Sequence, residues 1–268
     1  MQLFRKWGKR FLEDNVFDLS AQLAYYFLVS LFPFSFLVFT LLGYLPISTE
    51  YALTLFQSVA PEDAYRLMEY SLIRLLDEQR GDVLSVSLII MIWLSSIGIH
   101  AIIRAFNHAY QIEETRPFLR ELALGVLLTL GLVFAVFTAL LLPVYGRLLG
   151  EYVFSRTGWS HPFWDAWQIA RYFISFLVLF TMFSALYKFA PYKKLSLANV
   201  WPGSLYSALG WHGISYIFSR YVSYFDYSQI YGNLGALLTL MIWFYLSAMI
   251  LITGGQLNAI LTLGRDNN

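Results

Sequence analysis

The sequence predicts an all-α protein that crosses a membrane several times as a polytopic helical bundle. Hydrophobic residues make up 58% of the 268 residues and charged residues only 13%, whereas an ordinary soluble domain carries about 25% charged residues. The apolar residues also occur in blocks about as long as a bilayer is thick. We therefore expect lipid to be the solvent of a single membrane domain, residues 1–268.

Six segments are candidate membrane spans, because a helix needs about 20 predominantly apolar residues to cross the hydrocarbon core. They are residues 21–45, 83–103, 122–145, 172–189, 200–218 and 234–260. The third and sixth segments contain no charged residue. The fifth is small and polar, with Gly203, Ser207 and Gly210 among its residues, so we expect its neighbours to enclose it and approach its backbone closely.

Two further helices are expected to form without spanning. Residues 3–12 interleave basic and aromatic side chains, which is typical of an interfacial helix in the headgroup layer. A simple topology anchor is the alternative interpretation of this segment. Residues 61–80 predict an amphipathic helix on the outer side, which begins at Pro61 and ends before Gly81.

Basic residues predict the orientation, because Lys and Arg in short loops concentrate on the cytoplasmic side. An N-terminus inside places most of them in cytoplasmic segments: Arg5, Lys6, Lys9, Arg10, Arg104, Arg116, Arg120, Lys188, Lys193, Lys194 and Arg265. Fewer then lie outside: Arg66, Arg74, Arg80, Arg147, Arg156, Arg171 and Arg220. The sequence thus predicts a multi-pass protein whose N-terminus and C-terminus are both cytoplasmic.

Several function classes are disfavoured by composition. The net charge is +1, without the broad basic field that neutralises nucleic-acid phosphates, so no nucleic-acid partner is expected. No Cys is present, so there is no disulfide framework, thiol nucleophile or Cys-based metal site. The sequence also lacks a closely spaced cluster of His and carboxylate residues of the metal-ligand type, a phosphate-cradling glycine loop and a nucleophile elbow. We expect no catalytic residues, no metal and no cofactor.

Ionisable groups within the spans are candidates for function, because they are costly there. In the second span Ser96, His100, Arg104 and His108 follow at steps of four, which places them on one helical stripe with Asn107 beside it. This stripe is a candidate polar pathway for a headgroup or a proton. The two histidines lie about 12 Å apart along the axis and cannot share one metal ion. In the alternative interpretation Arg104 snorkels to cytoplasmic phosphates and the histidines make interhelical hydrogen bonds.

Other polar residues extend the candidate pathway. His212 lies near the middle of the fifth span, where a structural hydrogen bond explains it as well as a functional role. Gln256 and Asn258 approach the cytoplasmic end of the last span, either to close helix contacts or to line a cavity. Arg220 and Asp226 form a candidate outer mouth among tyrosines, most of which an aromatic belt also explains.

Short segments along nearly the whole chain resemble the YihY/BrkB family of bacterial inner-membrane proteins. They are residues 21–26 (AQLAYY), 30–33 (SLFP), 105–110 (AFNHAY), 116–118 (RPF), 187–191 (YKFAP), 231–236 (YGNLGA), Trp243 with 245–248 (YLSA), and 254–259 (GGQLNA). The resemblance implies a six-span protein of the bacterial cytoplasmic (inner) membrane. The family commonly has an acidic residue where Gln256 stands here, which weakens any mechanism that needs a charge at that position.

The resemblance also bears on function. Family members have carried the label ribonuclease BN, widely regarded as a misassignment, and this sequence contains neither a nuclease metal cluster nor a basic groove. Other family names refer to virulence and serum resistance, and one branch has been connected with the export of lipid precursors. The resemblance therefore favours lipid handling in the cell envelope.

Three functions compete at this point. The first is transport or flipping of a lipid or other amphiphile, with the second and fifth spans around the polar part. The second is a noncatalytic membrane scaffold or assembly partner in envelope biogenesis, and the third is an intramembrane enzyme. Membrane lipids are the expected partners, whereas a homo-oligomer or an envelope-protein partner stays open.

Overall fold

The computed structural model describes residues 2–43, 73, 81–113, 116–157, 161–224 and 234–266, and the regular secondary structure in these residues is α-helical. The helices are α1 (Gln2–Glu13), α2 (Val16–Gly43), α5 (Gly81–Tyr110), α6 (Phe118–Thr157), α7 (His161–Phe189), α8 (Leu197–Tyr224) and α10 (Leu234–Asp266). The all-α prediction is confirmed for this part of the chain. The expected outer helix at 61–80 lies outside the described residues, apart from Ile73.

Each expected span lies on a separate long helix, although the first span, 21–45, runs two residues past the described end of α2. Three helices among the described residues are long and apolar enough to cross a membrane, with windows at Leu119–Val136, Ile169–Phe189 and Leu234–Gly264. Large apolar side chains also face outward, and Phe134 and Phe173 are 67% and 61% exposed. Such a surface suits lipid rather than water.

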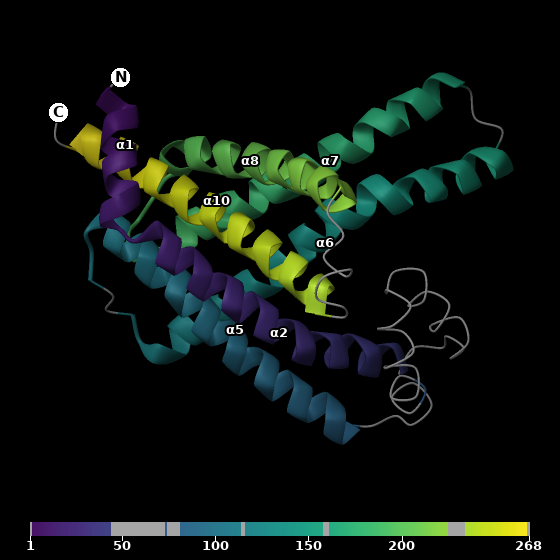
Figure 1. Cartoon of the computed structure of the whole chain (residues 1–268), viewed down its shortest axis with the longest axis horizontal. Coiled ribbons are helices and arrows are strands. Elements are labelled where there is room, and N and C mark those ends of the chain that lie inside the picture. Colours follow the sequence, from purple (N-terminus) through teal and green to yellow (C-terminus); the bar gives the residue numbers. More distant parts are fainter. Residues whose placement is uncertain are drawn as a thin grey trace.

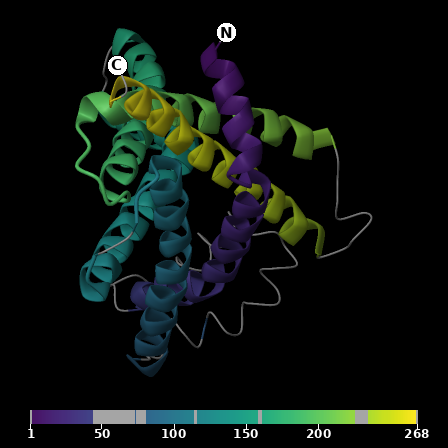
Figure 2. The same ribbon diagram turned by 90° about the vertical axis from the view of Figure 1, so that its left-hand side faces the viewer.

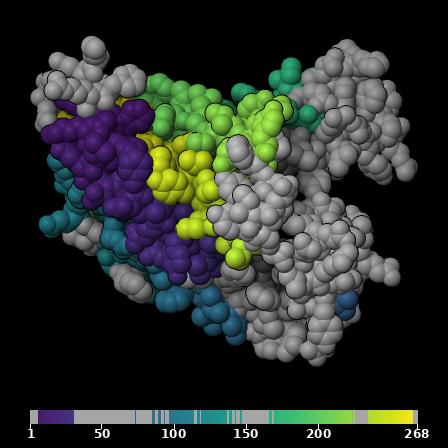
Figure 3. All heavy atoms as spheres, viewed as in Figure 1, coloured from purple at the N-terminus to yellow at the C-terminus, as the bar shows by residue number. Residues whose placement is uncertain are grey.

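Helix α10 is the central element of the bundle. It contacts α1, α2, α5, α7 and α8, and Figure 1 shows it between α8 and α2. In the space-filling view, part of α10 remains visible between these two helices (Figure 3). Every residue from Ile250 to Gln256 is nevertheless buried. Burial all round the axis is expected for a helix at the centre of a bundle.

Glycines allow α8 and α10 to cross at close range. A Cβ atom on Gly203 would collide with the backbone carbonyl of Gly254, and one on Gly254 would collide with the Ser207 hydroxyl. On the other side of α10, a Cβ on Gly255 would lie 2.7 Å from Cδ1 of Phe106 in α5. Small residues permit this kind of backbone approach in membrane bundles.

Helix α1 lies across the C-terminal part of α10. The Trp7 indole N–H donates to the carbonyl of Thr253 at 3.3 Å, and the Trp7 ring meets the edge of Tyr206 with centroids 5.2 Å apart. Figures 1 and 2 place both chain termini at this end of the molecule. At the opposite end, α6 and α7 form a pair that projects beyond the other described helices (Figure 1).

We predict that Gly203→Ala destabilises the protein by about 1–3 kcal/mol, because the added methyl group meets a backbone carbonyl that cannot rotate away. Gly213→Ala in the same helix is the matched control, since nothing lies within 4 Å of its Cβ position. That control should be neutral or stabilising by up to about 1 kcal/mol. Thermal unfolding in detergent, followed by tryptophan fluorescence, measures both. Equal melting temperatures for the two variants would contradict the close contact.

Candidate functional site

The turn between α1 and α2 presents a carboxylate to α10. Asn15 adopts a φ of 50°, a left-handed conformation that asparagine tolerates better than most residues. The backbone N–H of Asp14 donates to the carbonyl of Arg10 at 2.9 Å, and that of Leu19 donates to Asn15 at 3.0 Å. The turn therefore ends one helix and starts the next within two residues, and it leaves the Asp14 side chain free to point toward α10 and α5.

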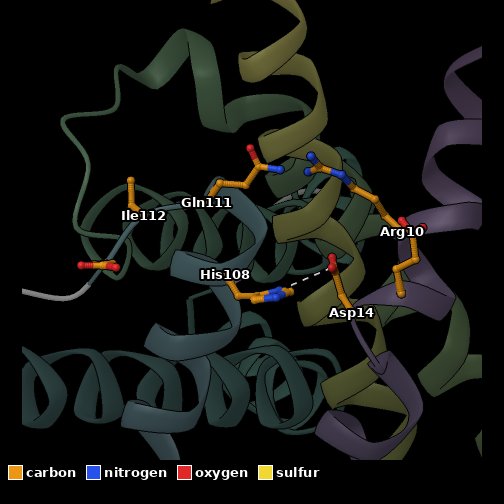
Figure 4. Close-up of a pocket in the computed structure, with 7 residues that line it drawn as sticks. Arg10, Asp14, His108, Gln111 and Ile112 are labelled. Carbon is orange, nitrogen blue, oxygen red and sulfur yellow. Dashed lines mark ion pairs between the residues drawn. The ribbon is translucent and has the colours of Figure 1, made fainter.

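Asp14 joins two distant parts of the chain. The side-chain amide of Gln256, only 1% exposed, donates to Oδ2 of Asp14 at 2.7 Å. The same nitrogen lies 3.4 Å from the carbonyl of Arg10. Nδ1 of His108 lies 3.4 Å from the other carboxylate oxygen, and the dashed line in Figure 4 marks this pair. A buried amide needs such an acceptor, because burial without one is costly. We call these four residues, Arg10, Asp14, His108 and Gln256, the polar junction.

The C-terminus of α5 forms the opposite side of the junction. Gln111 has a φ of 57°, and the N–H groups of Gln111 and Ile112 donate back to His108 and Asn107, each at 3.0 Å. This pair of bonds is a Schellman motif, which satisfies the last carbonyls of a helix. Arg10 Nη1 donates to the Ala109 carbonyl at 3.0 Å. The negative end of the α5 dipole also stabilises the positive charge of Arg10.

Residues near this helix end fix its position further. The side-chain oxygen of Asn107 accepts a hydrogen bond at 2.8 Å from the backbone N–H of Tyr192, just beyond α7. Tyr110 is 3% exposed, and burial raises its pKa, so the phenol stays protonated. Lys193 lies 5.9 Å from the centre of the Tyr110 ring. The end of α5 is therefore held from both α1 and the segment after α7.

An open cavity of about 410 Å³ lies at the junction. Its lining comprises Arg10, Glu13, Asp14, His108, Gln111, Ile112 and Glu113. Figure 4 shows the side chains of Arg10 and Gln111 extending from α1 and α5 toward the same opening, with α10 behind them. The volume is in the range of small-molecule clefts. The cavity contains three carboxylates, one guanidinium and one imidazole. It can therefore bind both a cationic and an anionic group of a ligand.

A second polar cluster is buried among α7, α8 and α10. The Tyr187 hydroxyl lies 2.6 Å from the Ser207 hydroxyl and donates to the carbonyl of Leu251 at 2.8 Å. The side-chain oxygen of Asn258 accepts from the backbone N–H of Gly203 at 2.7 Å. Tyr187, Ser207 and Asn258 are at most 1% exposed. These groups hold the helices together and do not line the cavity at the junction.

The α5 stripe is divided between different neighbours. His100 pairs with Glu121 of α6, and both side chains are mostly buried, at 17% and 14% exposed. Arg104 is exposed, and His108 belongs to the junction. Ser96 lies in α5, but its side chain is outside the described residues. The spacing of four residues correctly placed them on one helix, but it could not predict that His100 pairs with Glu121 and His108 with Asp14.

The remaining candidates lie elsewhere. His212 sits on α8 near Trp211, with ring centroids 5.6 Å apart, and near Phe176 of α7, at 6.4 Å. Among the described residues its buried Nε2 has no hydrogen-bond partner. Arg220 is exposed and lies over the Tyr216 ring, 5.5 Å from its centroid, while Asp226 falls outside the described residues. Within the described chain the predicted pathway residues therefore occupy several places.

Most residues that line the cavity, Asp14 among them, were not sequence candidates, and neither was Glu121, the partner of His100. Asp14 follows the expected interfacial helix directly, and Glu121 stands directly before the third expected span, so both resembled ordinary flanking charges. Their positions at helix boundaries were the available signal.

Among the described residues, no group of three or more His, Asp or Glu side chains is arranged to hold a metal ion.

Comparison with known proteins identifies the family. A profile described as Virulence factor BrkB matches residues 8–268, nearly the whole chain. The chain belongs to the BrkB family. The family resemblance drawn from the sequence is thus confirmed.

Relatives within the BrkB family carry different descriptions. The chain is 45% identical over 243 residues to the putative ribonuclease-like protein YfkH of Bacillus subtilis, covering 90% of this chain and 88% of that protein. It is 29% identical over 255 residues to UPF0761 membrane proteins of Xanthomonas campestris and Xanthomonas axonopodis, covering 93% of this chain. The chain spans 58% of the length of these Xanthomonas proteins. No solved structure matches it.

We predict that the Asp14–Gln256 contact contributes about 1.5–3 kcal/mol, the range for buried hydrogen bonds to a charged group. Asp14→Leu, Gln256→Leu and the double variant form a cycle that measures the coupling from their free energies of unfolding. Glu13→Ala is the control, because it breaks the exposed Lys9–Glu13 pair one residue away and should cost at most about 1 kcal/mol. A coupling near zero would show that the two side chains do not depend on each other.

Proposed function

We propose that this BrkB-family membrane protein spans the bacterial cytoplasmic membrane six times and moves a lipid or other amphiphile across it. The observation that carries the proposal is the open cavity at the polar junction, which offers charges of both signs beside the basic helix α1. A cavity of this kind suits the polar part of an amphiphile. The apolar flanks of the bundle suit its chains.

The six-span arrangement is supported by the separate helices on which the six expected segments lie. Helix α8 is the least apolar of them, yet it packs against both α7 and α10. Its small residues Gly203, Ser204 and Ser207 are buried there. A polar span enclosed by its neighbours avoids the cost of exposing its hydroxyl groups to lipid.

The proposed orientation, with both termini in the cytoplasm, is supported by basic residues around the junction. Arg10 contacts the end of α5, and Arg116 Nη2 donates to the carbonyl of Ala190 at 2.8 Å. Lys6 and Lys9 are exposed on α1 at the same end. Basic residues at the cytoplasmic boundary also attract anionic headgroups.

We propose a zwitterionic headgroup as the ligand of the cavity. Glu13, Asp14 and Glu113 supply acceptors for an ammonium group, and Arg10 supplies donors for a phosphate. Since the sequence contains no phosphate-cradling nucleotide motif, the transport is passive or coupled to an ion. We propose phosphatidylethanolamine as the first probe because it carries both charges.

We predict that proteoliposomes containing the protein move fluorescent phosphatidylethanolamine between leaflets faster than empty liposomes do. Glu113→Gln removes one cavity carboxylate and should slow the movement by about two- to fivefold, as expected for an exposed electrostatic contact. Asp18→Asn is the matched control, because Asp18 is an exposed carboxylate on α2 that does not line the cavity. Loss of outer-leaflet fluorescence after adding a reductant gives the rate.

A wild-type rate equal to that of empty liposomes, with and without a proton gradient, would contradict transport. It would favour the alternative function, a noncatalytic membrane scaffold, which is supported by the polar contacts between helices. The deeper polar groups of Tyr187, Ser207 and Asn258 are engaged in contacts between helices.

A further inference from the structure

Arg171 on α7 is a buried cation that the proposed function does not use. Its side chain is only 6% exposed, and among the described residues its Nε and Nη1 atoms have no hydrogen-bond partner. An arginine can donate five hydrogen bonds and stays charged. A buried charge whose donors lack acceptors is strongly unfavourable, so an anion that accepts from the guanidinium would stabilise this site.

The position of Arg171 in the α6–α7 contact sharpens this requirement. Trp167 and Ser175 lie one turn before and after it on the same face of α7, and both donate to carbonyls of α6. The indole N–H of Trp167 bonds to Gly146 at 2.7 Å, and the Ser175 hydroxyl bonds to Ala139 at 3.2 Å. Between them, Nε and Nη1 of Arg171 have no acceptor among the described residues. A Cβ atom on Gly146 would lie 3.7 Å from Cδ of Arg171, so the glycine brings the α6 backbone close to the arginine stem.

The surroundings of Arg171 are those of a membrane boundary. It is the third residue of the apolar window Ile169–Phe189, so it lies about one helical turn or less from the end of that window. Its guanidinium carbon lies 5.1 Å from the centre of the Tyr172 ring, and Tyr172 is 54% exposed. The neighbouring Ile169 and Phe173 are 72% and 61% exposed. Headgroup phosphates occupy this depth beside tyrosines of the aromatic belt.

We propose that Arg171 binds the phosphate of a phospholipid at the end of the bundle opposite the termini, with the acyl chains along the exposed face of α7. The planar guanidinium fork suits a phosphate, which it can contact through two parallel hydrogen bonds. The site rests on the six-span arrangement of the proposed function but not on transport. Lipid binding and lipid movement therefore succeed or fail separately.

The test measures lipid binding to the purified full-length chain in mild detergent by native mass spectrometry. The probes are phosphatidylglycerol, diacylglycerol with the same acyl chains, and inorganic phosphate. We expect phosphatidylglycerol to bind the wild type more tightly than diacylglycerol does. Arg171→Met should weaken phosphatidylglycerol binding by about tenfold or more, the scale of a lost charge-assisted contact. Arg171→Lys should bind with intermediate affinity, because it keeps the charge and loses the fork.

Arg220→Met is the matched control, because Arg220 also lies over a tyrosine ring but is exposed. It should bind phosphatidylglycerol as the wild type does. Thermal unfolding without added lipid separates binding from folding. Arg171→Met should be as stable as the wild type or more so, since it removes a buried charge whose Nε and Nη1 atoms lack hydrogen-bond partners among the described residues.

Three results would overturn the proposal. The first is equal phosphatidylglycerol affinity in the wild type and Arg171→Met. The second is an Arg171→Met variant that is much less stable without lipid yet binds phosphatidylglycerol normally, which would make Arg171 a structural residue. The third is inorganic phosphate that binds as tightly as phosphatidylglycerol, which would assign the site to a free anion rather than a lipid.

Discussion

A polar group inside a membrane bundle must find its partner within the protein, because lipid supplies none. In this protein α10 makes several of its closest contacts with other elements within five consecutive residues, 254–258. Gly254 lies against α8, Gly255 lies against Phe106 of α5, Gln256 bonds to the turn between α1 and α2, and Asn258 accepts from the α8 backbone. Helices α5, α7 and α8 and the turn after α1 meet at this segment. Their spacing depends on Gly254 and Gly255, which have no side chain, and on the hydrogen bonds of Gln256 Nε2 and Asn258 Oδ1.

The same segment relates the core to the candidate site. Gln256 is buried in the bundle, yet its partner Asp14 lines the open cavity, so the wall of the cavity is positioned by the core rather than by a surface loop. The hydroxyl groups of Tyr187 and Ser207, which do not line the cavity, are engaged with each other and with α10 inside the bundle. Under the proposed function, a headgroup that enters the cavity therefore needs movement of the helices to pass further.

The sequence was sufficient for what depends on local composition and spacing. The lengths of the apolar blocks predicted the long helices, and the small residues of the fifth expected span predicted the close packing of α8. The contacts of the site depend instead on long-range geometry. Asp14 and Gln256 are 242 positions apart, and only the left-handed turn at Asn15 and the crossing of α1 over α10 bring them together. Likewise, the sequence places Arg171 among the ordinary basic residues of the outer side, and only the structure shows that it is buried in the α6–α7 contact.

The proposed function requires that the polar junction face the cytoplasm at one end of a six-span bundle. Because the chain contains no Cys, Gln111→Cys at the cavity and Tyr224→Cys at the end of α8 each introduce a unique thiol. Both positions are exposed. A membrane-impermeant maleimide applied to intact spheroplasts and to inverted vesicles measures the side on which each thiol lies. We expect Gln111→Cys to react only in inverted vesicles and Tyr224→Cys only in spheroplasts. Reaction of both variants from the same side, or of Gln111→Cys from outside, would contradict it.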